Sequence, residues 1–281
     1  MRRQPSKNRR VCFFTLTSVL LISFFTFTAS AQQKYSLRYK FDKGEKLQYK
    51  TERHDSTETD QGGQPSVQQI TVWALQTLSV EDADDKSFRV TLKMDSTWSD
   101  QDNAAGEGSG PGGGRRFRGM RGPRERSYEI SPVGKAVSGE EPLSPVLLIL
   151  PEQDISINES WNFEVTTEQT GRRQGQTTVM GQCLLYDVQE ENGRRLAVII
   201  VSIESQSEGQ FQFQPQGREP VSGTFASTSK GTNLVYFDID RGRIVEVVSE
   251  ETRESNTEST MSSGRTLSKS NSTVTLVSES K

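Results

Sequence analysis

The chain contains a single histidine, His54, and every mechanism that needs an imidazole base would have to use it. Serine and cysteine hydrolases of the triad type rely on such a base. His54 lies in the polar stretch TERHDSTET with Asp55 beside it, a setting that favours a solvated surface side chain. Zinc sites built from two or more histidines, or from several cysteines, are excluded because only Cys12 and Cys183 are present. We therefore expect no catalytic and no metal-binding residues.

Acidic residues often stand next to each other, which raises the question of carboxylate catalysis. Glycoside hydrolases hold two carboxyl groups a short distance apart across one sugar site. Neighbouring residues of a strand point to opposite faces, so adjacent acids do not meet that requirement. We expect them in acidic turns instead, at positions 84–85, 140–141, 190–191 and 250–251.

Two short motifs have part of the pattern of a known site. Ser227-Thr-Ser-Lys230 has the spacing of a serine–lysine acyl-enzyme, but that pair acts from a helix and this stretch is typical of a strand. Asp238-Ile-Asp240-Arg-Gly242 is similar to the start of a calcium loop but lacks the later ligands. A hairpin turn is the better interpretation of the second motif.

Tryptophans and one apolar segment are the candidates for a hydrophobic ligand site. Residues 142–151 are very hydrophobic and are bounded by prolines. Their lack of alternation predicts a short helical segment over 143–150 that covers part of a concave sheet, with a buried strand as the alternative. The candidate ligand-binding residues are Trp73, Trp98, Leu147, Ile149 and Trp161, with a purely structural role in the core as the alternative.

Alternation of apolar and polar residues predicts antiparallel strands over most of the chain. We expect an all-β or mainly β fold, a large antiparallel meander that forms an open or partly closed barrel. One half would span residues 32–100, and the second, 128–281, would pack with it. The expected strands are 35–41, 47–50, 67–80, 88–94, 128–130, 161–165, 177–188, 195–204, 209–213, 221–237, 244–249 and one near 274–277.

The first 31 residues have the three parts of a secretory signal peptide. Five basic residues and no acid precede an apolar run from Val11 to Thr28, and Ala29-Ser-Ala31 fits a signal-peptidase site. An uncleaved membrane anchor is the alternative, because the run is nearly long enough to span a bilayer. We expect cleavage after Ala31, no transmembrane span in the mature chain, and a periplasmic or extracellular location.

Removal of the signal would leave an acidic chain with one cysteine. Of the 34 Lys and Arg, 29 remain against 37 Asp and Glu, a net charge of about −8 that argues against nucleic acid and anionic membranes as partners. Cys183 has no partner for an intramolecular disulfide, and we expect it to be buried as a small apolar side chain.

Residues 101–127 change abruptly in composition to glycine and arginine, which predicts a disordered loop. In an exported protein such arginines point to polyanions of the envelope: acidic polysaccharide, lipopolysaccharide or an acidic protein face. A solvated insertion without a partner is the alternative. The candidate polyanion-binding residues are Arg115, Arg116, Arg118, Arg121 and Arg124.

Two stretches resemble an uncharacterised family of exported bacterial β-rich proteins: YKFDKGEKLQY from Tyr39 and LPEQDISINESW from Leu150. Where the family has Leu-Pro followed by Gly-Asp-Ser-Trp, this chain has Asn158-Glu159 at the Gly-Asp positions, and Asn also accepts the positive φ of a turn. The resemblance implies an exported, β-rich envelope protein of unassigned activity. More loosely, its topology is similar to the periplasmic half-barrel carriers of lipids and lipoproteins.

These observations together predict an exported envelope protein that is not an enzyme and uses no cofactor. The first hypothesis is that it binds a hydrophobic ligand or a polypeptide on the concave face of its sheet. The second is a structural or surface-interaction module without a ligand cavity. A hydrolase is the remotest alternative because of the single histidine.

Overall fold

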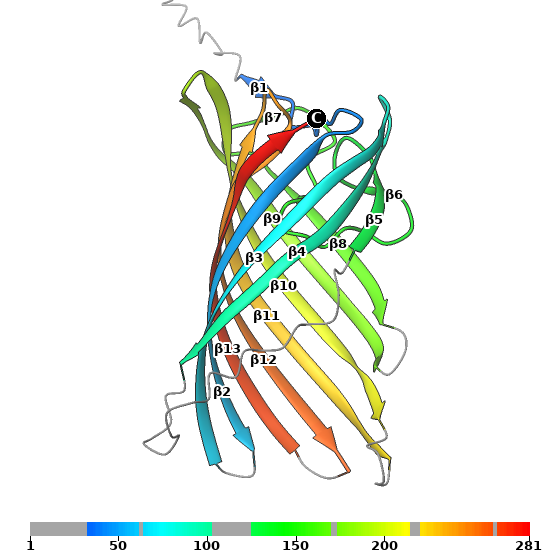
Figure 1. Ribbon diagram of the computed structural model, residues 1–281, viewed down its shortest axis with the longest axis vertical. Helices are drawn as coiled ribbons and strands as arrows, with labels where there is room; N and C mark the ends of the chain where they lie inside the picture. The colour runs from blue at the N-terminus through cyan, green and yellow to red at the C-terminus, as the bar shows by residue number, and fades with distance from the viewer. Residues whose placement is uncertain (1–32, 62–63, 103–124, 170–172, 214–219, 261–262) are drawn as a thin grey trace, which may run out of the picture. The chain divides into compact units, whose positions relative to one another are not determined.

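The computed structural model in Figure 1 describes residues 33–61, 64–102, 125–169, 173–213, 220–260 and 263–281. The expected signal peptide and the arginines at 115–124 lie outside the described residues. Gln33–Lys281 form one compact unit. No helix in the described ranges is long and apolar enough to cross a membrane.

The regular structure of the described chain consists of β-strands. Their bounds are β1 (Lys34–Tyr35), β2 (Lys46–Gln61), β3 (Gln64–Ala83), β4 (Phe88–Asp102), β5 (Glu125–Ile130), β6 (Ala136–Ser138), β7 (Ile155–Ser156), β8 (Ser160–Gln169), β9 (Arg173–Glu191), β10 (Arg194–Phe213), β11 (Val221–Asp238), β12 (Arg243–Ser259) and β13 (Ser263–Ser280).

Eleven strands form one antiparallel sheet in the order β6-β5-β4-β3-β2-β13-β12-β11-β10-β9-β8, and β1 pairs with β7 separately. β2 pairs with β13 from Lys46 to Gln61, so the first and last long strands lie side by side within the sheet (Figure 1). The sheet is not closed, because β6 and β8 are its edges. The predicted all-β fold with an open antiparallel sheet is thus confirmed.

Most strands continue well beyond the apolar runs that predicted them. β2 reaches Gln61, β12 reaches Ser259, and β13 is a long strand where only a short one near 274–277 was expected. β10 is one strand where two were expected. The extensions are mostly polar on both faces, so hydropathy alternation does not reveal them.

The short helical segment expected over residues 143–150 is wrong. These residues form turns and one isolated bridge. The N–H of Leu148 donates to the Tyr39 hydroxyl oxygen at 2.7 Å, and the N–H of Leu150 donates to the Val133 carbonyl at 2.8 Å. These N–H groups bond to other segments, and Pro142, Pro145 and Pro151 have no N–H to donate. The hydrogen-bond ladder of a helix therefore does not form. The segment is a loop in which Val146, Leu147, Ile149 and Leu150 are buried.

Residues 35–41 bury one face, as their alternation predicts, but they do not form the expected long strand. Pairing is limited to Lys34–Tyr35. Leu37, Tyr39 and Phe41 are nevertheless all buried. Isolated backbone bonds hold the segment, such as Tyr39 N–H to the Pro132 carbonyl at 2.8 Å. The period of two identifies the buried face but not the strand partner.

A hydrophobic core covers one face of the sheet, which we call the inner face, at the end near β1 and β7. Strand residues such as Leu78 and Val235 pack there against loop residues such as Leu150. The ring of Tyr39 meets that of Phe237 edge-on, with centroids 5.6 Å apart. We call this part of the sheet the cored end.

Beyond the core the same strands continue with mostly polar inner faces, and we call this part the polar end. The opposite, outer face of the polar end carries exposed charges such as Glu204, Glu208 and Glu250. Inner residues there are mostly half-buried and outer residues mostly exposed, alternating along the strands. The polar end comprises residues 53–61, 64–72, 97–102, 163–169, 173–181, 203–213, 221–231, 249–259 and 263–272.

Candidate functional site

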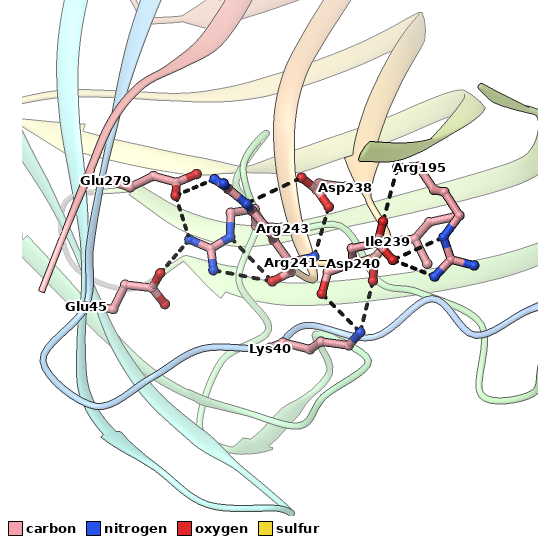
Figure 2. Close-up of polar contacts among 9 residues, drawn as sticks. All are labelled: Lys40, Glu45, Arg195, Asp238, Ile239, Asp240, Arg241, Arg243 and Glu279. Atoms are coloured by element: carbon pink, nitrogen blue, oxygen red, sulfur yellow. Dashed lines mark hydrogen bonds and ion pairs between the residues drawn. The ribbon is translucent and has the colours of Figure 1, made fainter. Parts of the chain in front are cut away.

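Charged side chains surround the turn between β11 and β12 (Figure 2). Asp238 is fully buried, and its Oδ1 accepts a hydrogen bond from the Arg241 N–H at 2.8 Å. Gly242 has a φ of +63°, and a Cβ there would lie 2.5 Å from the Arg38 carbonyl oxygen. The close approach and the backbone angle both require glycine at 242. The expected hairpin turn is confirmed.

Lys40 and Arg195 hold the tip of this turn. Lys40 donates through Nζ to the Ile239 carbonyl at 3.0 Å, and Arg195 donates through Nε to Asp240 Oδ1 at 3.1 Å. Hydrogen bonds from Arg195 hold the pKa of the Asp240 carboxyl below its usual value. Asp240 therefore stays ionised and forms an ion pair with Arg195 of β10 (Figure 2).

Arg243 joins the first and last long strands at the cored end. Its Nη1 lies 2.5 Å from Glu45 Oε1 and 3.6 Å from Glu279 Oε2. Arg243 and Glu45 are both buried. Arg241 donates through Nη1 to Glu279 Oε2 at 2.8 Å. Because Glu45 precedes β2 and Glu279 lies in β13, these contacts tie β2, β12 and β13 together.

The contacts of this charge cluster stabilise the fold. Glu45, Asp240 and Glu279 each form an ion pair with an arginine, so their carboxylates are already engaged within the protein. Asp238 Oδ2 is buried without a hydrogen-bond donor among the described residues, and the Nε atom of Arg241 lies 4.0 Å away. The cluster brings together no hydroxyl or thiol nucleophile. Its members are Lys40, Glu45, Arg195, Asp238, Asp240, Arg241, Arg243 and Glu279.

The other chemically suggestive residues of the sequence lie apart. His54 is exposed on the outer face of β2, with Nδ1 3.1 Å from Thr71 Oγ1. Ser227 is buried on the inner face of β11, whereas Lys230 on the outer face bonds Glu204 at 2.8 Å. Within the described ranges, no three His, Cys, Asp or Glu side chains lie where they could hold a metal ion.

The inner face of the polar end carries a row of hydroxyl groups that crosses eight strands. Cross-strand pairing places each serine or threonine opposite the next, from β8 to β3. Neighbouring strands lie about 4.8 Å apart, so a hydroxyl recurs at roughly that interval. This hydroxyl row consists of Thr167, Thr177, Ser207, Ser227, Ser255, Thr266, Thr59 and Ser66.

Hydrogen bonds link members of the hydroxyl row to neighbours on the same face. The hydroxyl oxygens of Thr177 and Ser207 lie 2.9 Å apart. Arg253 donates through Nε to Ser227 Oγ at 2.8 Å. A hydroxyl has one donor and two acceptor positions, so these contacts leave hydrogen-bonding capacity on the face.

A second polar row lies one residue pair closer to the core. Ser205 and Ser229 hydroxyl oxygens are 2.9 Å apart, and those of Thr57 and Ser268 are 3.2 Å apart. Arg253 stands in this row, paired with Ser229 on one side and Ser268 on the other. No carboxylate of the described residues forms an ion pair with its guanidinium, although Glu251, two residues away on β12, shares the inner face.

Phenylalanines on the inner face lie opposite glycines. Phe163 pairs with Gly181, Phe225 with Gly209, and Phe211 with Gly223. A Cβ on Gly209 would lie 2.9 Å from Phe225 Cε1, and one on Gly223 would lie 2.6 Å from Phe211 Cζ. The rings therefore occupy space that side chains at these glycines would fill. The face thus combines hydroxyls with half-buried aromatic rings.

Three of the predicted ligand-binding residues lie together, in or against the core. Leu147 and Ile149 are buried, and the indole N–H of Trp161 donates to the Ile149 carbonyl at 2.8 Å. Trp161 is half-buried against the same core cluster as Leu147. Neighbouring protein groups already occupy the apolar surface of this group.

Trp73 and Trp98 form a separate pair. They are directly opposite on β3 and β4, with ring centroids 6.4 Å apart and planes 14° from parallel. The neighbour Ala74 is buried on the inner face, so Trp73 and its partner are on the outer face, where Trp98 is 45% exposed. The five predicted ligand-binding residues therefore do not line one surface.

A groove of about 670 Å³ lies over β9 to β12 at the polar end. Most of its lining side chains, including Gln176, Glu208 and Asn256, belong to the outer face. The predicted polyanion-binding residues Arg115, Arg116, Arg118, Arg121 and Arg124 lie outside the described residues.

Sequence reasoning missed the hydroxyl row and Arg253. A signal for the hydroxyl row exists in β10, where residues 203–213 alternate between Glu or Gln on one face and Ile, Ser, Gly or Phe on the other. A search for alternation of small or hydroxyl residues with charged residues, in place of apolar with polar, would have found it.

No protein-family model and no curated protein matches the chain. Similar solved structures include OccK2 (OpdF) from Pseudomonas aeruginosa, over 83% of this chain and 98% of its own. Another is an outer membrane channel from Pseudomonas putida F1, over 85% of this chain and 98% of its own. Each is 8% identical with a TM-score of 0.25, a level of similarity that carries no argument.

Proposed function

We propose that this chain is an exported, non-enzymatic envelope protein that binds an extended saccharide on the inner face of its polar end. The observation that carries the proposal is the hydroxyl row. Eight hydroxyl residues at intervals of about 4.8 Å would span roughly 34 Å, a length suited to a chain-like ligand.

The chemistry of this face favours a sugar over an acyl chain. Serine and threonine hydroxyls both donate and accept hydrogen bonds, as sugar hydroxyls do. Phe163, Phe211 and Phe225 add half-buried rings that offer apolar contact to the C–H groups of a sugar ring. Leu147 and Ile149, which the sequence predicts as contacts for a hydrophobic ligand, are buried in the core.

Removal of hydroxyls from the inner face tests the proposal. Thr177→Val with Thr266→Val removes two members of the hydroxyl row at nearly constant shape. Thr228→Val with Thr252→Val is the matched control, because these threonines are exposed on the outer face of β11 and β12. The affinity for dextran and for polygalacturonate oligomers is measured by calorimetric titration. It should fall at least tenfold in the double variant Thr177→Val, Thr266→Val and stay unchanged in the control.

Equal affinities of the two double variants would overturn the inner-face site. Failure of the unmodified protein to bind either probe would favour the alternative, a structural module whose hydroxyls only bond one another.

The Arg253 guanidinium separates acidic from neutral saccharides as the ligand. Arg253→Gln should weaken polygalacturonate binding at least fivefold and leave dextran binding unchanged, because a guanidinium recognises carboxylates through charge-assisted hydrogen bonds. Arg265→Gln is the control with the same charge change; Arg265 pairs with Glu254 at 2.9 Å on the outer face. An equal loss of polygalacturonate affinity in Arg253→Gln and Arg265→Gln would overturn the role of Arg253 and indicate only a long-range charge effect.

Export has its own test. Intact-mass measurement of the protein recovered from the envelope should show Gln32 as its first residue, the product of cleavage after Ala31. A mass that includes residues 1–31 would contradict cleavage and leave the membrane-anchor interpretation.

A further inference from the structure

The two edges of the long sheet are protected unequally. At the margin that ends in β6, β5 pairs with β4 only from Phe88 to Lys93, so the rest of β4 is also an edge. The uncovered part of β4 has a register shift next to Asp95, which also forms an ion pair with Lys93. β8 pairs with β9 without a register shift and contains no lysine or proline. Bulges, prolines and charged side chains, especially lysines, keep edge strands from pairing, and of these β8 has only Glu164 and Glu168.

The backbone of β8 is open on the side away from β9. Apart from the β9 ladder, no backbone hydrogen bond joins Ser160–Gln169 to another described segment. The N–H and C=O groups on that side therefore have the geometry that an added strand requires. Figure 1 shows β8 at the margin of the sheet, with no described strand beyond it.

We infer that β8 is a docking edge for an extended polypeptide segment of a partner protein, which adds to the sheet as a further strand. This inference goes beyond the proposed function, because it uses the edge of the sheet and not the inner face. Main-chain hydrogen bonds would supply affinity and side chains on the two faces would supply selectivity.

The side chains of β8 define the chemistry of that segment. Trp161, Phe163 and Val165 lie on the inner face, next to the core. Glu164 and Glu168 are exposed on the outer face. A strand placed beside β8 would present apolar residues on the inner side and basic residues on the outer side, because opposite charges across strands attract. The partner segment thus alternates apolar residues with Lys or Arg.

A second copy of this chain fits the edge poorly. In an antiparallel pair of two β8 strands, the outer faces would bring Glu164 and Glu168 of one copy beside those of the other. Like charges opposite each other on a sheet are destabilising. Charge therefore favours a basic partner over self-association.

A capped nine-residue peptide in which lysine alternates with valine is the probe. Fluorescence anisotropy should show binding to the purified full chain, and hydrogen exchange should slow in residues 160–169. The same peptide N-methylated at every residue keeps its charge but can donate no backbone hydrogen bond along either edge. It should bind at least tenfold more weakly; equal binding would overturn strand addition.

Charge reversal on β8 provides the second arm. Glu164→Lys with Glu168→Lys should weaken peptide binding at least tenfold. Glu208→Lys with Glu258→Lys makes the same charge change on the outer faces of β10 and β12, away from the edge, and should change it less than twofold. Equal losses would overturn the assignment to β8, and so would dimerisation of the chain through β8 without peptide. Saccharide binding by these variants reports on the proposed function independently.

Discussion

The cored end and the polar end are two regions of the same strands, and they are held together differently. At the cored end, side chains such as Leu78 and Phe237 are completely buried, and each such burial contributes roughly 1.5–3 kcal/mol. At the polar end the inner face bears hydroxyls, whose hydrogen bonds contribute only about 0.5–1.5 kcal/mol each. One region anchors the sheet, and the other keeps a hydrogen-bonding surface available.

One uninterrupted strand can therefore pack into the core over part of its length and form a hydrogen-bonding surface over the rest. β10 runs from the buried Ile199 to the half-buried Phe211 as one strand. The backbone ladder continues, while the side chains pass from packing to hydrogen bonding. Local opening should therefore begin at the polar end, where apolar burial is least.

The largest effect is expected from a core truncation. Phe237→Ala removes a fully buried ring and should lower the free energy of unfolding by about 3–5 kcal/mol. Phe211→Ala is the matched change at the polar end and should cost less than half as much. Urea unfolding followed by tryptophan fluorescence measures both. Equal costs would remove the energetic distinction between the two ends.

The next largest effect concerns the buried ion pair of the charge cluster. Arg243→Met leaves Glu45 buried without its cation and should cost about 3 kcal/mol or more. Arg265→Gln breaks an exposed pair with Glu254 and should cost less than about 1 kcal/mol. The same unfolding measurement compares them. A loss below 1 kcal/mol for Arg243→Met would show that the cluster does not secure the cored end.

A glycine substitution probes the polar end itself. Gly181→Ala places a methyl group in the space of the Phe163 ring and should destabilise by about 1–3 kcal/mol. In a Phe163→Leu background the same substitution should cost less than half of that, because the smaller side chain leaves room. A double-mutant cycle gives the difference. Absence of coupling would mean that the ring does not need glycine opposite it.

The smallest effect compares two threonines. Thr91 at the cored end is buried and bonds Ser127 at 2.8 Å, so Thr91→Val should cost about 1–2 kcal/mol. Thr266 at the polar end is half-buried, and Thr266→Val should change stability by less than about 0.5 kcal/mol. Reversal of that order would indicate that the hydroxyl row supports the fold, which would weaken its proposed role in binding.

The sequence predicts the cored end well and the polar end poorly, for one physical reason. Burial of apolar side chains leaves a period of two in runs such as 67–80 and 88–94, and strands exist there. In β12 and β13 the inner face of the polar end is built mostly from Ser and Thr, with Glu251 and Arg253 among them, and hydropathy does not separate these residues from the outer Glu, Lys and Arg. The loop over 143–150 shows the converse, since most of its apolar residues, such as Val146 and Leu150, are buried without forming a helix or strand.

The candidate site depends on pairing between distant segments, which no local pattern contains. Thr59 joins the hydroxyl row only because β2 pairs with β13, and Glu45 meets Arg243 for the same reason. Trp73 and Trp98 were predictable as neighbours across a hairpin, but their face was not. One register shift is enough to change which face a residue occupies.

The pairing of β2 with β13 also constrains how the chain folds. Residues 46–61 are synthesised early and can pair with β3 soon afterwards. Their pairing with β13 requires residues 264–280, which are synthesised much later. Contacts of such long sequence separation form slowly, because the intervening chain must first lose conformational entropy. The two halves of the sheet cannot join until residues 264–280 have emerged. A chain that crosses a membrane pore amino end first would thus complete its central ladder only after these residues have crossed.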